Sequence, residues 1–136
     1  MMNYQEIKAE KEKKVGQLIK DCGMFFAFSN KQWDENKTPL KEGEKYLDMR
    51  HGSYMPKSQI DNWKSGIATI EKWAKDEIKK GKLEDEEILS ELYNYECFYT
   101  GSIEDAMDAL GSKYPEEKVW AIYNKNKKEA FELNEA

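Results

Sequence analysis

The sequence predicts an α+β fold: a mostly helical single domain spanning residues 1–136, with about five helices and a small antiparallel sheet of two or three strands. Three observations point to this class. Apolar residues recur every three or four positions over most of the chain, which is the spacing of one helix face. Two ring-rich stretches, residues 24–29 and 45–57, are instead of strand length. A length of 136 residues suits a single core.

The first element expected is a helix over residues 3–22. Its apolar residues, from Tyr4 to Ile19, fall on one face, and Gly23 is placed to end the helix in a left-handed conformation. The period then changes, because residues 24–29 (MFFAFS) form an apolar run too short for a buried helix. We expect a strand there.

A short helix and two further strands are expected next. Ser29, with Gln32 three residues later, resembles a capping box, so a turn or two of helix should form before Pro39 stops it. Residues 45–50 predict a second strand, which turns at His51-Gly52-Ser53 into a short third one. Because two or three strands alone are marginal in water, this sheet must pack against helices.

Both faces of the expected sheet are apolar. Alternation along the first strand sends Phe26 and Phe28 to one face, and Phe25 and Ala27 to the other. Either helices cover both faces or one face is a contact surface. Four amphipathic helices are available, which favours full coverage.

The second half of the chain is expected to be helical throughout. Ser58 should cap a helix that closes near Gly81. Another helix is expected over residues 84–99, opened by the acids EDEE, which suit the positive end of a helix dipole. A short helix begun by the capping box SIED should stop at Gly111, and a last helix should begin at Pro115.

The composition indicates a compact core inside a heavily charged shell. Apolar residues make up 39% of the chain, charged residues 36% and aromatic residues 12%, and this share of large rings argues against disorder. No signal-peptide core and no long apolar run are present, so we expect a cytoplasmic protein that does not engage membranes. Cys22 and Cys97 lie in apolar sequence and are expected to be buried free thiols.

The net charge of −5 conceals an acidic segment, residues 83–112, which holds nine acids and no base. It is an ordinary solvated face, a partner for the lysine-rich first half, or a docking surface for a basic protein groove, including one that normally holds nucleic acid. Direct nucleic-acid binding is disfavoured because the lysines are interleaved with glutamates. The candidate acidic surface comprises Glu84, Asp85, Glu86, Glu87, Glu91, Glu104, Asp105 and Asp108.

The ninth acid, Glu96, lies in the unusual stretch ELYNYECFYTG. On a continuous helix, Ile88, Leu92, Tyr95 and Tyr99 share one stripe, and Glu96 lies along its margin. A carboxylate beside the core must be paired, hydrogen-bonded or protonated, because unpaired burial costs roughly several kcal/mol. Glu96 is therefore the residue in this stretch whose partner matters most.

Natural partners for Glu96 are tyrosine hydroxyls, His51 and Arg50, the single arginine of the chain. In one interpretation Glu96 is a structural tether between helix and sheet. In the other it belongs to a ligand-binding or catalytic pocket. The candidate pocket comprises Phe26, Phe28, Arg50, His51, Tyr54, Glu96 and Tyr99.

Catalytic signatures are not apparent. The sequence contains no P-loop, GxGxxG, HExxH, CxxC or GxSxG motif, and one histidine with two separated cysteines does not make a zinc site. We therefore predict no catalytic residue, no metal ligand and no cofactor. A hydrolase that uses Glu96 with His51 is the least favoured alternative, since acid–base catalysis requires both groups to be within hydrogen-bond reach of the reacting atoms.

Three segments carry a resemblance that covers roughly residues 4–123: FFAFSNKQWDENKTPLKEGEKY, GSYMPKSQIDNW and LYNYECFYTGSIEDAMDAL. Their most specific parts are FFAFSN, GEKY with the later PK, and ECFYTG. The chain resembles a family of small uncharacterised proteins found in bacteriophages, prophages and gut bacteria. The resemblance implies a mobile-element setting, in which small acidic proteins without catalytic motifs often bind host factors, but it implies no site residue.

The sequence thus favours a non-enzymatic binding protein of phage or prophage origin. Its expected partner is a host protein, for example a nucleic-acid-handling defence component such as a CRISPR effector, engaged through the acidic segment. The alternative is a small-ligand or nucleotide-binding module that uses the candidate pocket. The oligomeric state is left open.

Overall fold

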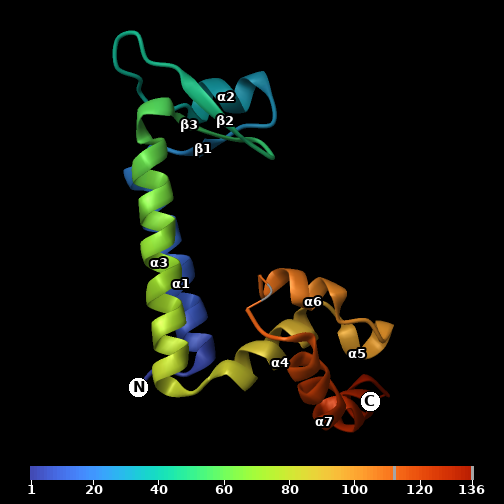
Figure 1. Ribbon diagram of the computed structural model, residues 1–136. Coiled ribbons are helices and arrows are strands. Elements are labelled where there is room, and N and C mark those ends of the chain that lie inside the picture. The colour runs from blue at the N-terminus through green and yellow to red at the C-terminus, as the bar shows by residue number, and fades with distance from the viewer. Residues whose placement is uncertain (112, 136) are drawn as a thin grey trace. The chain divides into compact units, whose positions relative to one another are not determined.

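The computed structural model describes residues 1–111 and 113–135, and it confirms the α+β class (Figure 1). Within these residues seven α-helices accompany one three-stranded antiparallel sheet. The helices are α1 (Tyr4–Asp21), α2 (Asn30–Asn36), α3 (Ile60–Gly81), α4 (Glu84–Asn94), α5 (Cys97–Thr100), α6 (Glu104–Ala109) and α7 (Glu116–Glu135). The strands are β1 (Phe25–Phe26), β2 (Tyr46–Arg50) and β3 (Ser53–Pro56), and a 3-10 turn, Lys57–Gln59, precedes α3.

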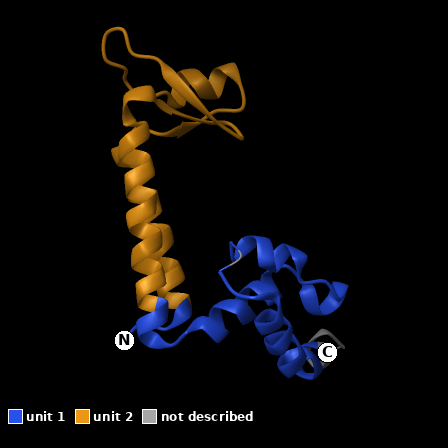
Figure 2. Cartoon of the chain, viewed as in Figure 1, with its two compact units in different colours: residues 1–4, 78–136 blue, residues 5–77 orange. Residues whose placement is uncertain are grey.

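The contacts within the chain divide it into two compact units, coloured separately in Figure 2. The helical unit comprises residues 1–4 and 78–136, and the sheet unit comprises residues 5–77. That they fold together as a single domain stays a prediction.

In the sheet unit, α1 and α3 pack side by side as an antiparallel pair (Figure 1). Near one end, Gly66 of α3 lies so close to Leu18 that an added Cβ would be 2.5 Å from the Leu18 Cδ1 atom. Farther along, the Lys14 ammonium lies 4.8 Å from the centre of the Trp73 ring. The expected first helix is thus confirmed, and Gly23 follows it with a φ of 68°.

The sheet has the strand order β1-β3-β2, and a cluster of aromatic rings holds it against α2. Phe25 of β1 is paired with Tyr54 of β3, and their rings stack with centres 5.6 Å apart. Trp33 of α2 meets Phe25 and Tyr54 edge-on, at 5.2 and 4.9 Å. Tyr46 of β2 completes the cluster by contacting both Phe25 and Trp33. Rings therefore supply most of the packing for three very short strands.

The predicted turn between the second and third strands is confirmed. His51 and Gly52 connect Arg50 to its partner Ser53, and both turn residues have positive φ, as a type I′ hairpin turn requires. The Phe28 ring lies against Gly52, where an added Cβ would be 2.3 Å from the ring. Glycine is therefore needed here for its conformation and for its size.

The expectation that helices cover both faces of the sheet is wrong for one face. Phe25 and Ala27 are buried, but Phe26 is 46% exposed and Phe28 75% exposed. The reason is that α2 packs against one face of the sheet and leaves the other face uncovered. Within the described residues, Trp33 of α2 packs on the Phe25 face, whereas the ring of Phe28 contacts the turn at Gly52.

Two helix caps were predicted in this unit, and one of them is wrong. The Ser29 hydroxyl accepts from the Gln32 backbone N–H at 3.1 Å, as a capping box requires. Ser58 does not cap α3, because its hydroxyl donates instead to the Glu44 carboxylate. The chain then enters α3 through the 3-10 turn.

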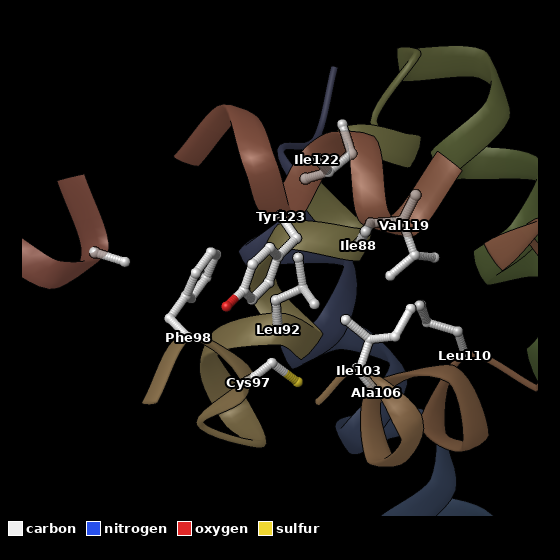
Figure 3. Close-up of a cluster of buried hydrophobic side chains, with 11 residues drawn as sticks. Ile88, Leu92, Cys97, Phe98, Ile103, Ala106, Leu110, Val119, Ile122 and Tyr123 are labelled. Atoms are coloured by element: carbon white, nitrogen blue, oxygen red, sulfur yellow. The ribbon is translucent and has the colours of Figure 1, made fainter. Parts of the chain in front are cut away.

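The helical unit has one continuous apolar core, drawn in Figure 3. Helices α4, α5, α6 and α7 each contribute to it, and Val119 and Ile88 are fully buried at its centre. Phe98 stacks on Tyr123 with ring centres 4.9 Å apart. The buried members are Ile88, Leu92, Cys97, Phe98, Ile103, Ala106, Leu110, Val119, Ile122, Tyr123 and Ala130.

The expected continuous helix over residues 84–99 is wrong. Helix α4 ends at Asn94, and Glu96 adopts a left-handed conformation, with a φ of 53°, before α5 begins. The break rotates the following residues, so that Cys97 and Phe98 enter the core, while Tyr95 is 44% and Tyr99 80% exposed. The left-handed conformation of Glu96 costs roughly 1–2 kcal/mol, and burial of the Phe98 side chain offsets it with about 1.5–3 kcal/mol.

Both cysteines are free and buried, as expected. Cys22 is 2% exposed and Cys97 is fully covered. Burial raises the pKa of both thiols, which keeps them in the unreactive protonated form.

Candidate functional site

Among the described residues, the buried carboxylate is Glu87, which the sequence had placed on the acidic surface. It is 6% exposed, and that assignment is corrected. Its Oε2 atom accepts from the Lys113 ammonium at 2.8 Å, and its Oε1 atom accepts from the Tyr114 hydroxyl at 2.6 Å. Burial, followed by the hydrogen bond to Glu87, raises the pKa of Tyr114. Glu87 therefore tethers α4 to the segment before α7.

Two other acids of the predicted acidic surface are also engaged within the helical unit. Asp85 faces the Lys118 ammonium at 3.9 Å, in a pair that is largely solvated. Glu91 is half-buried and accepts from the Tyr4 hydroxyl at 3.5 Å. Burial, and then the negative charges of Glu91 and Glu87, raise the pKa of Tyr4. The lysine partners of Glu87 and Asp85 thus offset part of the negative charge that was expected to face solvent, whereas Glu91 keeps its charge.

The remaining acids of the predicted surface carry the exposed charge. Glu86, Glu104, Asp105 and Asp108 are exposed, and none forms an ion pair with a side chain that the structure describes. Glu84, at the start of α4, is half-buried. The first turns of α4 and α6 hold several of these acids, where they also complement the helix dipoles.

A hollow of about 360 Å³ opens where α4 meets α5. The described residues that line it are three rings and one carboxylate: Tyr93, Phe98, Tyr99 and Glu96. Phe98 is 3% exposed and forms the floor, because its ring also stacks on Tyr123 in the core. The Tyr93 ring lies 5.1 Å from Phe98 at a tilt of 48°. Tyr93 is 43% and Tyr99 80% exposed, so these two rings reach solvent.

The break between α4 and α5 creates this hollow. The Glu96 N–H donates to the Tyr93 carbonyl at 3.1 Å, and the Glu96 carbonyl accepts from the N–H groups of Tyr99 and Thr100. These bonds hold Glu96 in its left-handed conformation, and Gly101, with a φ of 77°, ends the following turn. The expectation that Glu96 lies beside the core is wrong, since its side chain is exposed.

The residues of the predicted pocket belong to two different units. Phe26, Phe28, Arg50, His51 and Tyr54 lie in the sheet unit, whereas Glu96 and Tyr99 line the hollow of the helical unit. Arg50 and His51 are exposed at the hairpin turn. Tyr54 is half-buried and packs into the ring cluster with Phe25 and Trp33.

Sequence reasoning missed two residues of the hollow, Tyr93 and Phe98. Both were missed because residues 84–99 were treated as one continuous helix, on which Tyr93 and Phe98 lie outside the stripe predicted to face the core. The adjacent apolar pair Cys97-Phe98 was the available signal, since two neighbouring buried residues fit poorly on a helix margin.

No group of three or more His, Cys, Asp or Glu side chains among the described residues is placed to hold a metal ion. Within the same residues, no helix combines the length and apolar character needed to cross a bilayer. His51 and Glu96 belong to different units, so the acid–base pairing considered from the sequence stays untested.

The fold and this geometry define an α+β protein with an acidic segment and a ring-lined hollow in its helical unit. The chain belongs to a family of unknown function, DUF7659, whose model matches residues 3–129. This agrees with the resemblance to an uncharacterised family. No curated protein and no solved structure matches the chain.

Proposed function

We propose that the chain is a non-enzymatic binding protein of mobile-element origin that engages a host protein through the acidic segment. The observation that carries this proposal is the combination of unpaired acids and exposed tyrosines in one helical unit. Glu86, Glu104, Asp105 and Asp108 have no described ionic partner, and Tyr99 is 80% exposed.

Tyrosine rings on a surface support a protein-binding role for a physical reason. They bury a large area at a small cost in side-chain entropy, and each hydroxyl can stay hydrogen-bonded at an interface. Aromatic residues are accordingly enriched among the residues that dominate binding energy. The helical unit leaves Tyr93, Tyr95 and Tyr99 exposed although its apolar core is complete without them.

The charge of the acidic segment supports a basic partner. Exposed acids accelerate the encounter with a positively charged surface and disfavour acidic partners. A protein that handles nucleic acid carries such a surface, and a host defence component such as a CRISPR effector is one example. The resemblance to phage and prophage proteins supports the mobile-element setting.

Small-ligand binding is the second candidate, because the hollow offers a concave, ring-lined site. Its chemistry argues against a nucleotide. The charged side chain among its described lining residues is the Glu96 carboxylate, which would repel a phosphate.

The test is affinity capture from host lysate with the tagged chain, followed by mass spectrometry. The informative variant carries Glu86→Lys, Asp105→Lys and Asp108→Lys. The matched control, with the same change in charge, reverses three exposed acids of the sheet unit: Asp34→Lys, Glu35→Lys and Glu42→Lys.

We expect the first variant to lose one specific prey that the wild type and the control both retain. Retention of that prey should also weaken as salt is raised, because exposed charges are screened over about 8 Å at physiological ionic strength. An identical prey list for the three proteins would refute docking through the acidic segment.

A further inference from the structure

We infer that the hollow lined by Tyr93, Glu96, Phe98 and Tyr99 binds the guanidinium group of an arginine side chain presented by the protein partner. The inference rests on the proposed function, since it names the chemical group that the acidic segment would recognise. It is carried by the geometry and chemistry of the hollow.

The rings supply one half of the recognition. A cation is attracted to the face of an aromatic ring, and several rings around a concave site are the usual arrangement for an organic cation. Phe98 is 3% exposed because its ring packs on those of Tyr93 and Tyr123, so the rings that an entering group can meet are Tyr93 and Tyr99, which are 43% and 80% exposed. A volume of about 360 Å³ accommodates a single side chain.

The carboxylate supplies the other half. Glu96 is exposed at the hollow and forms no ion pair with a described side chain. The surrounding residues 83–112 contain no Lys or Arg, so no cation adjacent in sequence competes for this carboxylate. A charged group that enters beside the rings would therefore meet an available opposite charge.

The backbone of Glu96 serves the fold by turning Cys97 and Phe98 into the core, but its side chain has no described structural contact. Its φ of 53° lies in the left-handed region, where glycine or asparagine is favoured and a longer side chain costs stability. Arg50, His51 and Lys82 share this conformation at turns, so the inference rests on the side chain of Glu96 and not on its backbone. The side chain of Glu96 contributes no described hydrogen bond that would offset the strain, whereas its carboxylate lines the hollow.

Arginine fits this site better than the alternatives. Its planar guanidinium can stack on a ring and present two N–H groups to a carboxylate at the same time, whereas a lysine ammonium is compact and more strongly hydrated. An anion would be repelled by Glu96. A neutral apolar group would cover the carboxylate without pairing it, which costs free energy.

The test is an NMR titration of the full chain with N-acetyl-argininamide, followed through the ring protons of Tyr93, Phe98 and Tyr99. N-acetyl-citrullinamide is the matched probe, because it keeps the shape of arginine but carries no charge. We expect saturable shifts at the hollow with the arginine probe at concentrations up to about 50 mM, within the weak range of one side-chain contact. The citrulline probe should produce none.

Two substitutions at Glu96 distinguish the effect of removing its charge from an effect on folding. Glu96→Gln keeps the size and removes the charge, and it should weaken arginine binding about fivefold, the range of one exposed ion pair. Glu96→Gly relieves the left-handed strain, so the protein should stay folded while binding falls similarly. Glu104→Gln is the control, an exposed acid that does not line the hollow, and it should bind as the wild type does.

The outcomes distinguish this inference from the proposed function. No shift at the hollow, or equal shifts with the neutral probe, would overturn the arginine site even if charge reversal at Glu86, Asp105 and Asp108 still abolished capture of the host protein. Arginine-specific shifts that Glu96→Gln weakens would support the site even if that charge reversal changed no prey.

Discussion

The two units differ in how far their packing depends on aromatic residues. In the sheet unit Phe25, Trp33 and Tyr54 hold three short strands together through ring-to-ring contacts. In the helical unit mainly aliphatic residues fill the core, and Tyr93 and Tyr99 are left partly or largely exposed. The same enrichment in rings therefore indicates a structural cluster in one unit and a candidate binding surface in the other.

The physical cause of this difference is the amount of other apolar surface available. Strands of two to five residues bury too little area by themselves, so the sheet depends on the large area of each ring. Helices α4 to α7 bring together eleven buried residues, which suffice for a core without the exposed tyrosines. Rings that the core does not need are free to bind a partner.

The largest effect is expected from a substitution that tests whether the two units unfold separately. Phe98→Ala removes a buried ring from the helical unit and should cost about 3–5 kcal/mol of unfolding free energy. Hydrogen exchange should accelerate in residues 78–130 and stay nearly unchanged in residues 5–77. Trp33→Ala is the reciprocal variant and should loosen the sheet unit instead.

Equal acceleration in both units, from either variant, would contradict independent unfolding. It would mean that the chain is one cooperative domain, as the sequence predicted.

An intermediate effect is expected at the buried carboxylate, a feature of the helical unit. Lys113→Met leaves Glu87 with the Tyr114 hydroxyl as its remaining described partner, and should cost about 1–3 kcal/mol, measured by urea unfolding. Lys72→Met is the matched control, because it removes a solvated pair with Asp76 at 3.7 Å and should cost about 0–1 kcal/mol. Equal losses for the two variants would show that burial of Glu87 adds nothing to this pair.

The smallest expected effect is a pH dependence at the alkaline end. The pKa values of Tyr4 and Tyr114 are raised above 10.0, first by burial and then by nearby Glu91 and Glu87. The folded protein therefore keeps these protons after the unfolded chain has lost them. The stability that they contribute is fully present below pH 10 and is lost as the pH rises above it.

Thermal unfolding at a series of pH values checks this dependence. Tyr114→Phe and Tyr4→Phe should each lose less stability than the wild type between pH 9 and 11, because phenylalanine has no proton to release. Tyr99→Phe, which changes a largely exposed ring, should follow the wild type. If all four proteins declined in parallel, the two buried tyrosines would have no part in the alkaline loss.

Local patterns in the sequence were sufficient for much of the fold. The periodic apolar residues of α1 and α3, the capping box at Ser29 and the turn at His51-Gly52 all predicted the observed elements. Each of these signals depends on residues within one or two turns of chain. The free, buried state of Cys22 and Cys97 also followed from their apolar surroundings.

The features that were predicted wrongly depend on contacts between distant residues. Glu96 was assigned to the margin of the core because helical geometry was extended through it, and Ser58 was assigned as a cap before its hydroxyl was known to reach Glu44. The coverage of Phe26 likewise depended on where α2 packs, which strand alternation does not reveal.

By itself, the sequence determined the α+β class, the acidic segment and most helix boundaries, because these follow from composition and local periodicity. The tertiary structure decided which carboxylate is buried, Glu87 rather than Glu96, since Lys113 and Tyr114 come to Glu87 from 26 and 27 residues away. It also decided that the chain breaks at Glu96, which places Cys97 and Phe98 in the core and leaves Tyr95 and Tyr99 exposed. That break opens the hollow on which the proposed arginine site depends.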